Sequence, residues 1–166
     1  MKEIEVKFIV RDLNAIARTL KKLGGRCTWK GREESSYFDT PVHSLRRKGI
    51  VLRLRKWKGD SDFLTLKVEP KKKGKKFSVR KELQTAVDSA KMCEIFKELG
   101  FEESFRYAKN RAHWKLGKTS IELDLLKNKS YVEIEGTKKE IERLAPILGL
   151  DWKNSTTKSY VELLGK

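Results

Sequence analysis

Residues 119–136, TSIELDLLKNKSYVEIEG, contain two stretches in which apolar and charged side chains alternate. In the first, Glu122 and Asp124 alternate with Ile121 and Leu123, and in the second, Glu133 and Glu135 flank Ile134. Successive side chains of a β-strand point to opposite faces, so each stretch would have one acidic face and one apolar face. Asn128, between the stretches, is a turn former. The segment therefore predicts a hairpin with carboxylates on one side.

The same alternation recurs along most of the chain. Charged side chains occupy every second position at Glu3, Glu5 and Lys7, at Arg53 and Arg55, at Arg80 and Glu82, and at Lys109 and Arg111. A period of two predicts strands. Besides strands at 119–126 and 130–136, we expect strands at residues 1–10, 35–39, 50–57, 63–69, 77–85 and 105–115.

Three segments have helical periodicity instead. Asp12 is a candidate N-cap for a helix that ends at Gly24 and Gly25, and a second helix is expected at 88–99. Thr137 and Glu140 have capping-box spacing at the start of a third helix, which ends at Leu148 and Gly149. Residues 156–164 predict a final helical turn or two.

The charged faces have two interpretations. An ordinary antiparallel sheet could turn its charged face to water and its apolar face to helices. However, these faces are sorted into E-x-E, R-x-R and K-x-R pairs, whereas a solvated face would mix Lys and Glu with Ser and Thr. We therefore expect the α+β class: a closed eight-stranded antiparallel β-barrel, with the charges facing a tunnel and helices packed outside. The length of 166 residues suits one domain, residues 1–166.

The chain is strongly basic. Lys and Arg number 39 against 23 Asp and Glu, a formal net charge of +16. Such a surplus attracts polyanions, but a lysine-rich solvated surface explains it equally well. The lysine run at residues 71–76 reads more simply as a solvated hairpin tip than as a binding site.

Several functional classes are disfavoured. Two distant cysteines, Cys27 and Cys93, imply no disulfide framework, and the start MKEIEVKF is strand-like rather than a signal peptide. No apolar run approaches the length of a membrane span. A cytoplasmic protein without a membrane partner is expected. His43 and His113 are the only histidines, which excludes a histidine-rich metal site, and His113 suits a hydrogen bond at the barrel rim.

The paired charges suit phosphate and metal chemistry. Arginine offers a planar fork that matches phosphate oxygens, and carboxylate oxygens are hard ligands of the kind that Mg²⁺ or Mn²⁺ prefers. Rings of both signs around a ligand can offset one another, whereas buried charges of one sign are very costly.

The order of these residues resembles the CYTH superfamily, the triphosphate tunnel metalloenzymes, which include class IV adenylate cyclase and thiamine triphosphatase. Glu3-Ile4-Glu5-Val6-Lys7 looks like the family's amino-terminal E-x-E-x-K. Further segments follow in family order: residues 37–41, 52–55, 65–67, 80–82, 109–111, 121–124, 132–135 and 158–160. Two departures are visible: Gln84 stands where the family's R-x-E-x-E strand has its second carboxylate, and residues 128–131 lack the glycine usual before the last E-x-E strand.

The resemblance implies a role for each matching residue. Phosphate oxygens would be bound by Lys7, Arg53, Arg55, Lys67, Arg80, Lys109, Arg111 and Lys158. Mg²⁺ or Mn²⁺ would be held by Glu3, Glu5, Glu82, Asp124, Glu133 and Glu135. Glu5, Lys7 and Asp124 would serve the catalytic step.

The first functional hypothesis is a divalent-metal-dependent hydrolase of inorganic triphosphate or of an organic triphosphate, such as a nucleoside or thiamine triphosphate. Class IV adenylate cyclase, which makes cyclic AMP from ATP, needs the same charges and remains an alternative. A non-catalytic polyphosphate- or RNA-binding module is the third possibility, but a pure binder has no use for several acidic strands, so nucleic acid is not the expected partner. A monomer or homodimer is expected.

Overall fold

The computed structural model describes residues 2–70, 74 and 76–165. The lysine run at 71–76 therefore lies mostly outside the described residues, apart from Gly74 and Lys76. The helices and strands are, in chain order, β1 (Lys2–Val10), α1 (Leu13–Lys22), β2 (Arg26–Asp39), α2 (Ser44–Arg47), β3 (Ile50–Trp57), β4 (Asp62–Val68), β5 (Ser78–Val87), α3 (Ser89–Glu98), β6 (Glu102–Leu116), β7 (Thr119–Leu126), β8 (Lys129–Glu135), α4 (Lys138–Ile147), the 3₁₀ helix η1 (Trp152–Asn154), β9 (Ser155–Thr156) and α5 (Tyr160–Leu163).

The strands form one hydrogen-bonded sheet in the order β5-β4-β3-β2-β6-β7-β8-β1-β9, and β5 also pairs with β1. This extra pairing joins the two sides of the sheet, so eight strands close into an antiparallel β-barrel, with β9 as an additional short strand. The predicted fold class is confirmed.

The chain packs as two compact parts that are interleaved in sequence. The first part comprises residues 1–2, 31–72 and 80–109, and the second comprises residues 3–30, 73–79 and 110–166. That these parts make a single domain stays a prediction.

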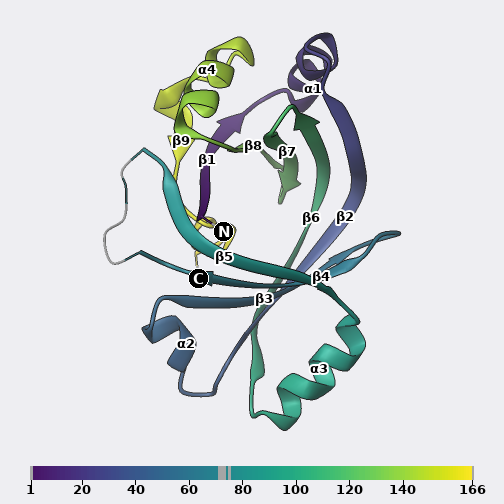
Figure 1. The fold of residues 1–166 in the computed structure, drawn as a ribbon, viewed down its shortest axis with the longest axis vertical. Helices are drawn as coiled ribbons and strands as arrows, with labels where there is room; N and C mark the ends of the chain where they lie inside the picture. The colour runs from purple at the N-terminus through teal and green to yellow at the C-terminus, as the bar shows by residue number, and fades with distance from the viewer. Residues whose placement is uncertain (1, 71–73, 75, 166) are drawn as a thin grey trace. The chain divides into compact units, whose positions relative to one another are not determined.

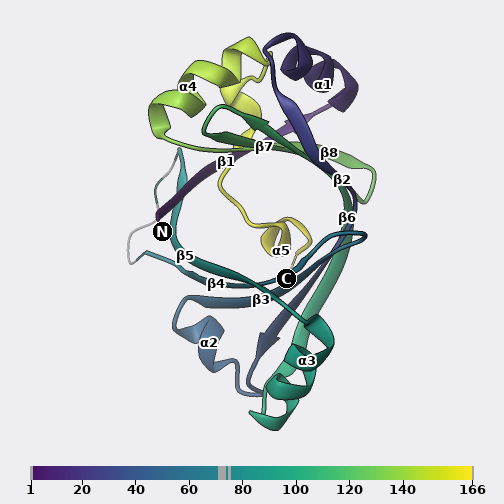
Figure 2. The ribbon, with the colours of Figure 1, turned by 45° about the vertical axis from the view of Figure 1, so that its right-hand side comes forward.

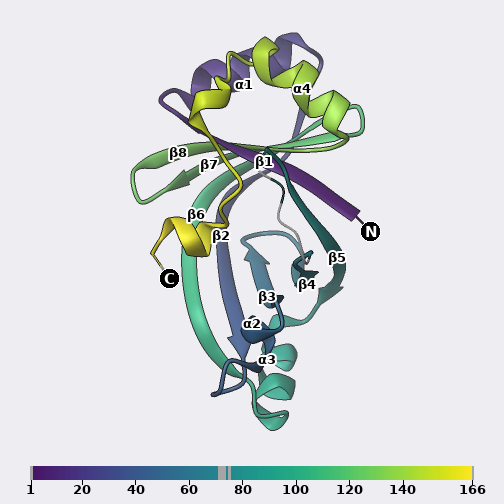
Figure 3. The same cartoon turned by 90° about the vertical axis from the view of Figure 1, so that its left-hand side faces the viewer.

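The second part buries its apolar strand faces under two helices. Figures 2 and 3 show α1 and α4 on the same side of β1, β7 and β8. Asp12 caps α1 and Thr137 forms a capping box with Glu140 at the start of α4, as predicted. The shared core contains Phe8 from β1, Ile134 from β8 and Leu144 from α4, each at most 2% exposed. Because neighbouring side chains on a strand point to opposite faces, this packing sends the charged residues to the other face.

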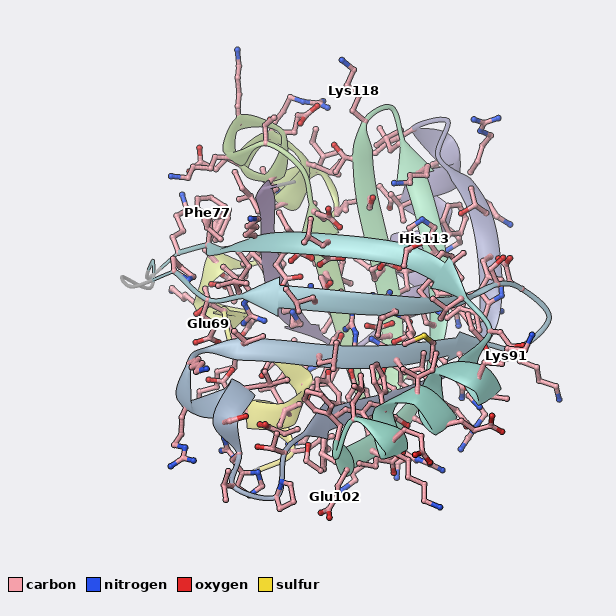
Figure 4. The ribbon with its side chains drawn as sticks, turned by 60° about the horizontal axis from the view of Figure 1, so that its bottom comes forward. Glu69, Phe77, Lys91, Glu102, His113 and Lys118 are labelled. Atoms are coloured by element: carbon pink, nitrogen blue, oxygen red, sulfur yellow. The ribbon has the colours of Figure 1, made fainter. Side chains whose placement is uncertain are left out.

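The first part repeats this arrangement with a smaller core. Figure 1 shows α2 and α3 on the same side of β3 and β4. Phe38 of β2, Leu54 of β3 and Phe96 of α3 form its buried cluster, and the Phe38 and Phe96 ring centroids lie 4.7 Å apart. In Figure 4, β3, β4 and β5 run side by side, with Glu69 just beyond the end of β4 and Lys91 on α3. Arg53 and Arg55 alternate with Leu54, so they lie on the face away from this core.

Several elements differ from the expected ones, and η1 and β9 were not expected at all. β2 begins at Arg26 rather than at residue 35, because residues 26–34 carry only two apolar side chains, Cys27 and Trp29, which are too few to predict a strand. The short helix α2 was not expected. Asp39 determines it: its carboxylate accepts hydrogen bonds from the backbone N–H groups of Thr40, Leu45 and Arg46 at 2.8, 2.9 and 3.0 Å. The tail helix expected within residues 156–164 is shorter and consists of α5 (Tyr160–Leu163) alone.

None of the helices in the described ranges is both long and apolar enough to cross a bilayer.

Candidate functional site

The second part gathers charged side chains from four strands into what we call the carboxylate cluster: Glu5, Lys7, Arg111, Glu122, Asp124 and Glu133. Strand register brings them together, since Lys7 lies opposite Glu133, Glu133 opposite Glu122, and Arg111 opposite Asp124. All are at most 9% exposed. Buried charges of this kind persist only when they are paired.

Lys7 joins two carboxylates of this cluster. Its Nζ lies 3.0 Å from Glu5 Oε1 and 2.8 Å from Glu133 Oε2. Burial lowers the pKa of Lys7, but the charges of Glu133 and Glu5 and their hydrogen bonds raise it more, so its pKa lies above the ordinary value. Lys7 is therefore a fixed ammonium ion rather than a proton acceptor at neutral pH.

Arg111 is bound to Asp124 by both arms of the fork. Arg111 Nε and Nη2 donate to Asp124 Oδ1 and Oδ2, both at 2.6 Å, and the hydroxyl of Tyr160 donates to Asp124 Oδ2 at 2.5 Å. Burial and the charge of Asp124 raise the pKa of Tyr160, so that hydroxyl keeps its proton. Asp124, 0% exposed, is thereby held by two donors from distant segments.

His113 extends the same face. Its Nδ1 lies 2.6 Å from Glu122 Oε1, and the other oxygen of Glu122 lies 3.6 Å from Arg111 Nε, beyond hydrogen-bonding distance. The predicted hydrogen bond of His113 is present.

The first part holds a second group, which we call the arginine cluster: Glu33, Arg53, Arg55, Lys67, Glu82 and Lys109. Glu33 lies at its centre and is 1% exposed. Its Oε1 lies 3.3 Å from Lys109 Nζ, and its Oε2 accepts a 2.8 Å hydrogen bond from Trp57 Nε1 and lies 3.8 Å from Arg55 Nη1. One carboxylate therefore touches two of the predicted phosphate-binding cations.

Arg53 differs from Arg111. Its Nε and Nη2 atoms are buried, and neither has a hydrogen-bond acceptor among residues 2–70, 74 and 76–165. Burial lowers the pKa of Arg53, but nearby groups, Tyr37 and Tyr107 first and then Glu33 and Glu82, raise it more, so the guanidinium stays charged. Buried donors without acceptors are costly, and functional sites are a common reason for them.

Pairs across β4 and β5 complete the arginine cluster. Lys67 lies opposite Glu82, with Lys67 Nζ 2.7 Å from Glu82 Oε2. Gln84, the departure from the family's carboxylate pattern, accepts hydrogen bonds from Arg55 Nη2 at 3.3 Å and from Thr65 Oγ1 at 3.1 Å. A neutral amide thus orients Arg55 where a carboxylate would have paired with it.

Four predicted residues, Glu3, Arg80, Glu135 and Lys158, are not members of either cluster. Glu3 is buried, Glu135 is half-buried opposite Glu5 and Ser120, and Lys158 is exposed before α5. Arg80 Nη2 lies 3.9 Å from Glu69 Oε1. That all of these residues line one tunnel stays a prediction.

Sequence reasoning missed Glu33, Trp57 and Tyr160. Glu33 lies in the part of β2 before residue 35, where no strand was expected, although Glu33, Ser35 and Tyr37 share one parity. Tyr160 is adjacent to the predicted Lys158-Ser159 segment, but its contact with Asp124, 36 residues away, leaves no mark in the sequence.

Whether this site can hold a divalent metal ion depends on the placement of its carboxylates. In the described part of the chain, no three Asp, Glu, His or Cys side chains are placed to hold a metal ion together. Nevertheless, the donor chemistry fits: Glu5 and Glu133 both face one cation, the Lys7 ammonium, and carboxylate oxygens are the ligands that Mg²⁺ and Mn²⁺ prefer.

Comparisons with known proteins agree with this fold. A Methanocaldococcus jannaschii protein that bears the provisional name of an adenylate cyclase is 32% identical over 177 residues, which cover 99% of each chain. A solved Pyrococcus horikoshii structure is similar, with a TM-score of 0.81 and 30% identity, covering 97% of this chain and 98% of that one. A Hippeastrum structure, whose description calls it a provisional adenylyl cyclase with a dominant triphosphatase activity, has a TM-score of 0.72 and 18% identity, covering 98% of this chain and 95% of that one.

The family assignment covers nearly the whole sequence. Residues 1–160 match the CYTH domain family, and the match includes both charged clusters. We conclude that this chain belongs to the CYTH domain family.

Proposed function

We propose that the chain is a divalent-metal-dependent hydrolase that cleaves the phosphoanhydride of an inorganic or organic triphosphate. The observation that carries the proposal is Arg53: its Nε and Nη2 donors are buried without an acceptor in the described residues, and the cations Arg55, Lys67 and Lys109 belong to the same cluster. A phosphate group would supply acceptor oxygens for these donors and negative charge to balance the cations.

Each cluster has a distinct task in this proposal. The arginine cluster binds phosphate oxygens, and Arg53 contributes two buried donors that have no acceptor in the described residues. The basic side chains stabilise the charge that develops on the transferring phosphoryl group. In the carboxylate cluster, Glu5 and Glu133 are the ligands that we assign to Mg²⁺ or Mn²⁺, which when bound would supply Lewis acidity and an activated water.

The protein residues around these ligands keep the charges in place. Lys7 forms ion pairs with Glu5 and Glu133 and remains protonated. In this proposal its positive charge stabilises a neighbouring phosphate or carboxylate, and it does not act as a base. Asp124 is held by hydrogen bonds from Arg111 and Tyr160 and so keeps one position. We therefore assign it the role of orienting a reacting group.

Adenylate cyclase is the alternative, because the Methanocaldococcus jannaschii relative carries that name. The two reactions differ in the phosphorus that is attacked, at the end of the chain in hydrolysis and at the α position in cyclisation. The Hippeastrum neighbour supports hydrolysis, since its description names a triphosphatase activity as dominant.

The test is product analysis with purified protein. Inorganic triphosphate, ATP and thiamine triphosphate are each incubated with Mg²⁺, with Mn²⁺ or with excess chelator, and phosphate, pyrophosphate and cyclic AMP are measured. We expect metal-dependent phosphate release without cyclic AMP. Cyclic AMP and pyrophosphate from ATP would establish the cyclase instead, and binding without turnover would establish a non-catalytic polyanion-binding module.

A further inference from the structure

Glu33 is a buried carboxylate within a cluster of cations. Its two oxygens lie 3.3 Å from Lys109 Nζ and 3.8 Å from Arg55 Nη1, and its charge also acts on Arg53. The side chains of Glu33 and Lys109 are each 1% exposed, so water screens this interaction very little.

The position of Glu33 is fixed from the other side by Trp57. The indole Nε1 donates to Glu33 Oε2 at 2.8 Å, and the guanidinium of Arg55 lies 5.8 Å from the centroid of the same indole. The indole of Trp57 also packs edge-on against Phe63, with ring centroids 5.5 Å apart. Glu33 therefore cannot swing away easily when another anion approaches.

The charges of the arginine cluster do not cancel. Arg53, Arg55, Lys67 and Lys109 contribute four positive charges and Glu33 and Glu82 two negative ones, so the cluster has a formal surplus of two. Without Glu33 the surplus would be three, and any anion would be attracted more strongly. Glu33 thus forms the ion pairs with Lys109 and Arg55 that a phosphate would otherwise form.

We propose that Glu33 is a resident counter-anion that lowers the affinity of the arginine cluster for every anion: it competes with incoming anions for Lys109 and Arg55, so that only a highly charged phosphate chain still binds well. This inference rests on the proposed function, since it takes phosphate as the ligand. Glu33 acts through Lys109 and Arg55 and is a positioning residue.

The experiment measures the binding of inorganic triphosphate and of orthophosphate by calorimetry, without metal, at low and high salt. Glu33→Gln keeps the shape and the acceptor for Trp57 but removes the charge. We expect this variant to bind inorganic triphosphate on the order of tenfold more tightly than the wild type at low salt, and orthophosphate more tightly as well. The gain should shrink at high salt because the extra charge is then screened.

Two further variants separate charge from packing. Glu103→Gln removes an exposed carboxylate paired with Arg106 in the same part of the chain and should leave both affinities within twofold. Glu33→Met is a second neutral variant of similar volume, in case the Gln variant folds poorly, and should also bind triphosphate more tightly.

The outcomes distinguish this inference from the proposed function. If the wild type binds triphosphate and the neutral Glu33 variants bind it equally or more weakly, Glu33 is only a structural ion-pair partner and the inference is wrong. If neither the wild type nor the variants bind triphosphate without metal, the inference fails, whereas the proposed function fails only if phosphate release with Mg²⁺ or Mn²⁺ is also absent.

Discussion

Arg53 and Arg111 have the same predicted role but different surroundings, and replacing each by methionine compares them directly. Arg111→Met removes two 2.6 Å hydrogen bonds and leaves Asp124, 0% exposed, with an uncompensated charge. Breaking such a buried pair costs about 3–5 kcal/mol. Arg53→Met removes a guanidinium with two buried donors that lack acceptors in the described residues, so the desolvation relieved offsets the attraction lost to Glu33 and Glu82.

We therefore expect Arg53→Met to change the free energy of unfolding by less than about 1 kcal/mol, while Arg111→Met lowers it by about 3–5 kcal/mol. The turnover of triphosphate by Arg53→Met should fall, although the stability of this variant is nearly unchanged. Loss of one charge-assisted contact to the reacting phosphates costs about 2–4 kcal/mol, a decrease in kcat/KM of roughly 30- to 1,000-fold.

The assays are urea unfolding followed by fluorescence and phosphate release from inorganic triphosphate. Lys118→Ala, which removes an exposed lysine from the turn between β6 and β7 (Figure 4), serves as the control and should change neither quantity. The reasoning is refuted if Arg53→Met unfolds as easily as Arg111→Met, or if its turnover equals that of the wild type.

Three further predictions follow from individual contacts. Glu5→Gln should abolish turnover with the fold intact by circular dichroism, because Lys7 keeps Glu133 as a partner; turnover in this variant, or in excess chelator, would contradict the metal assignment. Tyr160→Phe removes a hydrogen bond to the buried Asp124 and should lower the free energy of unfolding by about 1.5–3 kcal/mol in urea, and an unchanged midpoint would argue against this contact. Burial raises the pKa of Asp39, but the backbone N–H groups of Leu45, Arg46 and Thr40 lower it more, below its ordinary value of 3.8. The stability that this carboxylate adds is therefore complete above about pH 3.8 and is lost as the pH falls through the lower, folded-state pKa. The stability difference between the wild type and Asp39→Asn should accordingly be constant from pH 7 to about pH 5 and shrink below pH 3.8, and a difference that persists at the lowest pH would disprove this account.

Much of the fold could be predicted from local patterns. The period of two at residues 52–55, 121–124 and 132–135 indicated strands with one charged face, and the caps at Asp12 and Thr137 marked helix starts. These signals are local: a strand alternates its faces and a cap binds amides within one turn, whatever the rest of the chain does. The first half of β2 carries only a weak signal of this kind, because Cys27 and Trp29 are its only apolar side chains.

The sequence by itself determined which residues have the charge and parity to belong to a phosphate and metal site, from Glu5 and Lys7 to Arg53 and Glu133. It could not determine how those charges pair. Tyr160 reaches Asp124 across 36 residues, and Trp57 reaches Glu33 across 24. Such contacts depend on strand register and on side-chain direction, which are fixed only when the whole sheet forms. Tertiary structure alone therefore decided that Arg111 is bound to a carboxylate, that Arg53 keeps two buried donors without acceptors in the described residues, and that Glu33 lies among the cations.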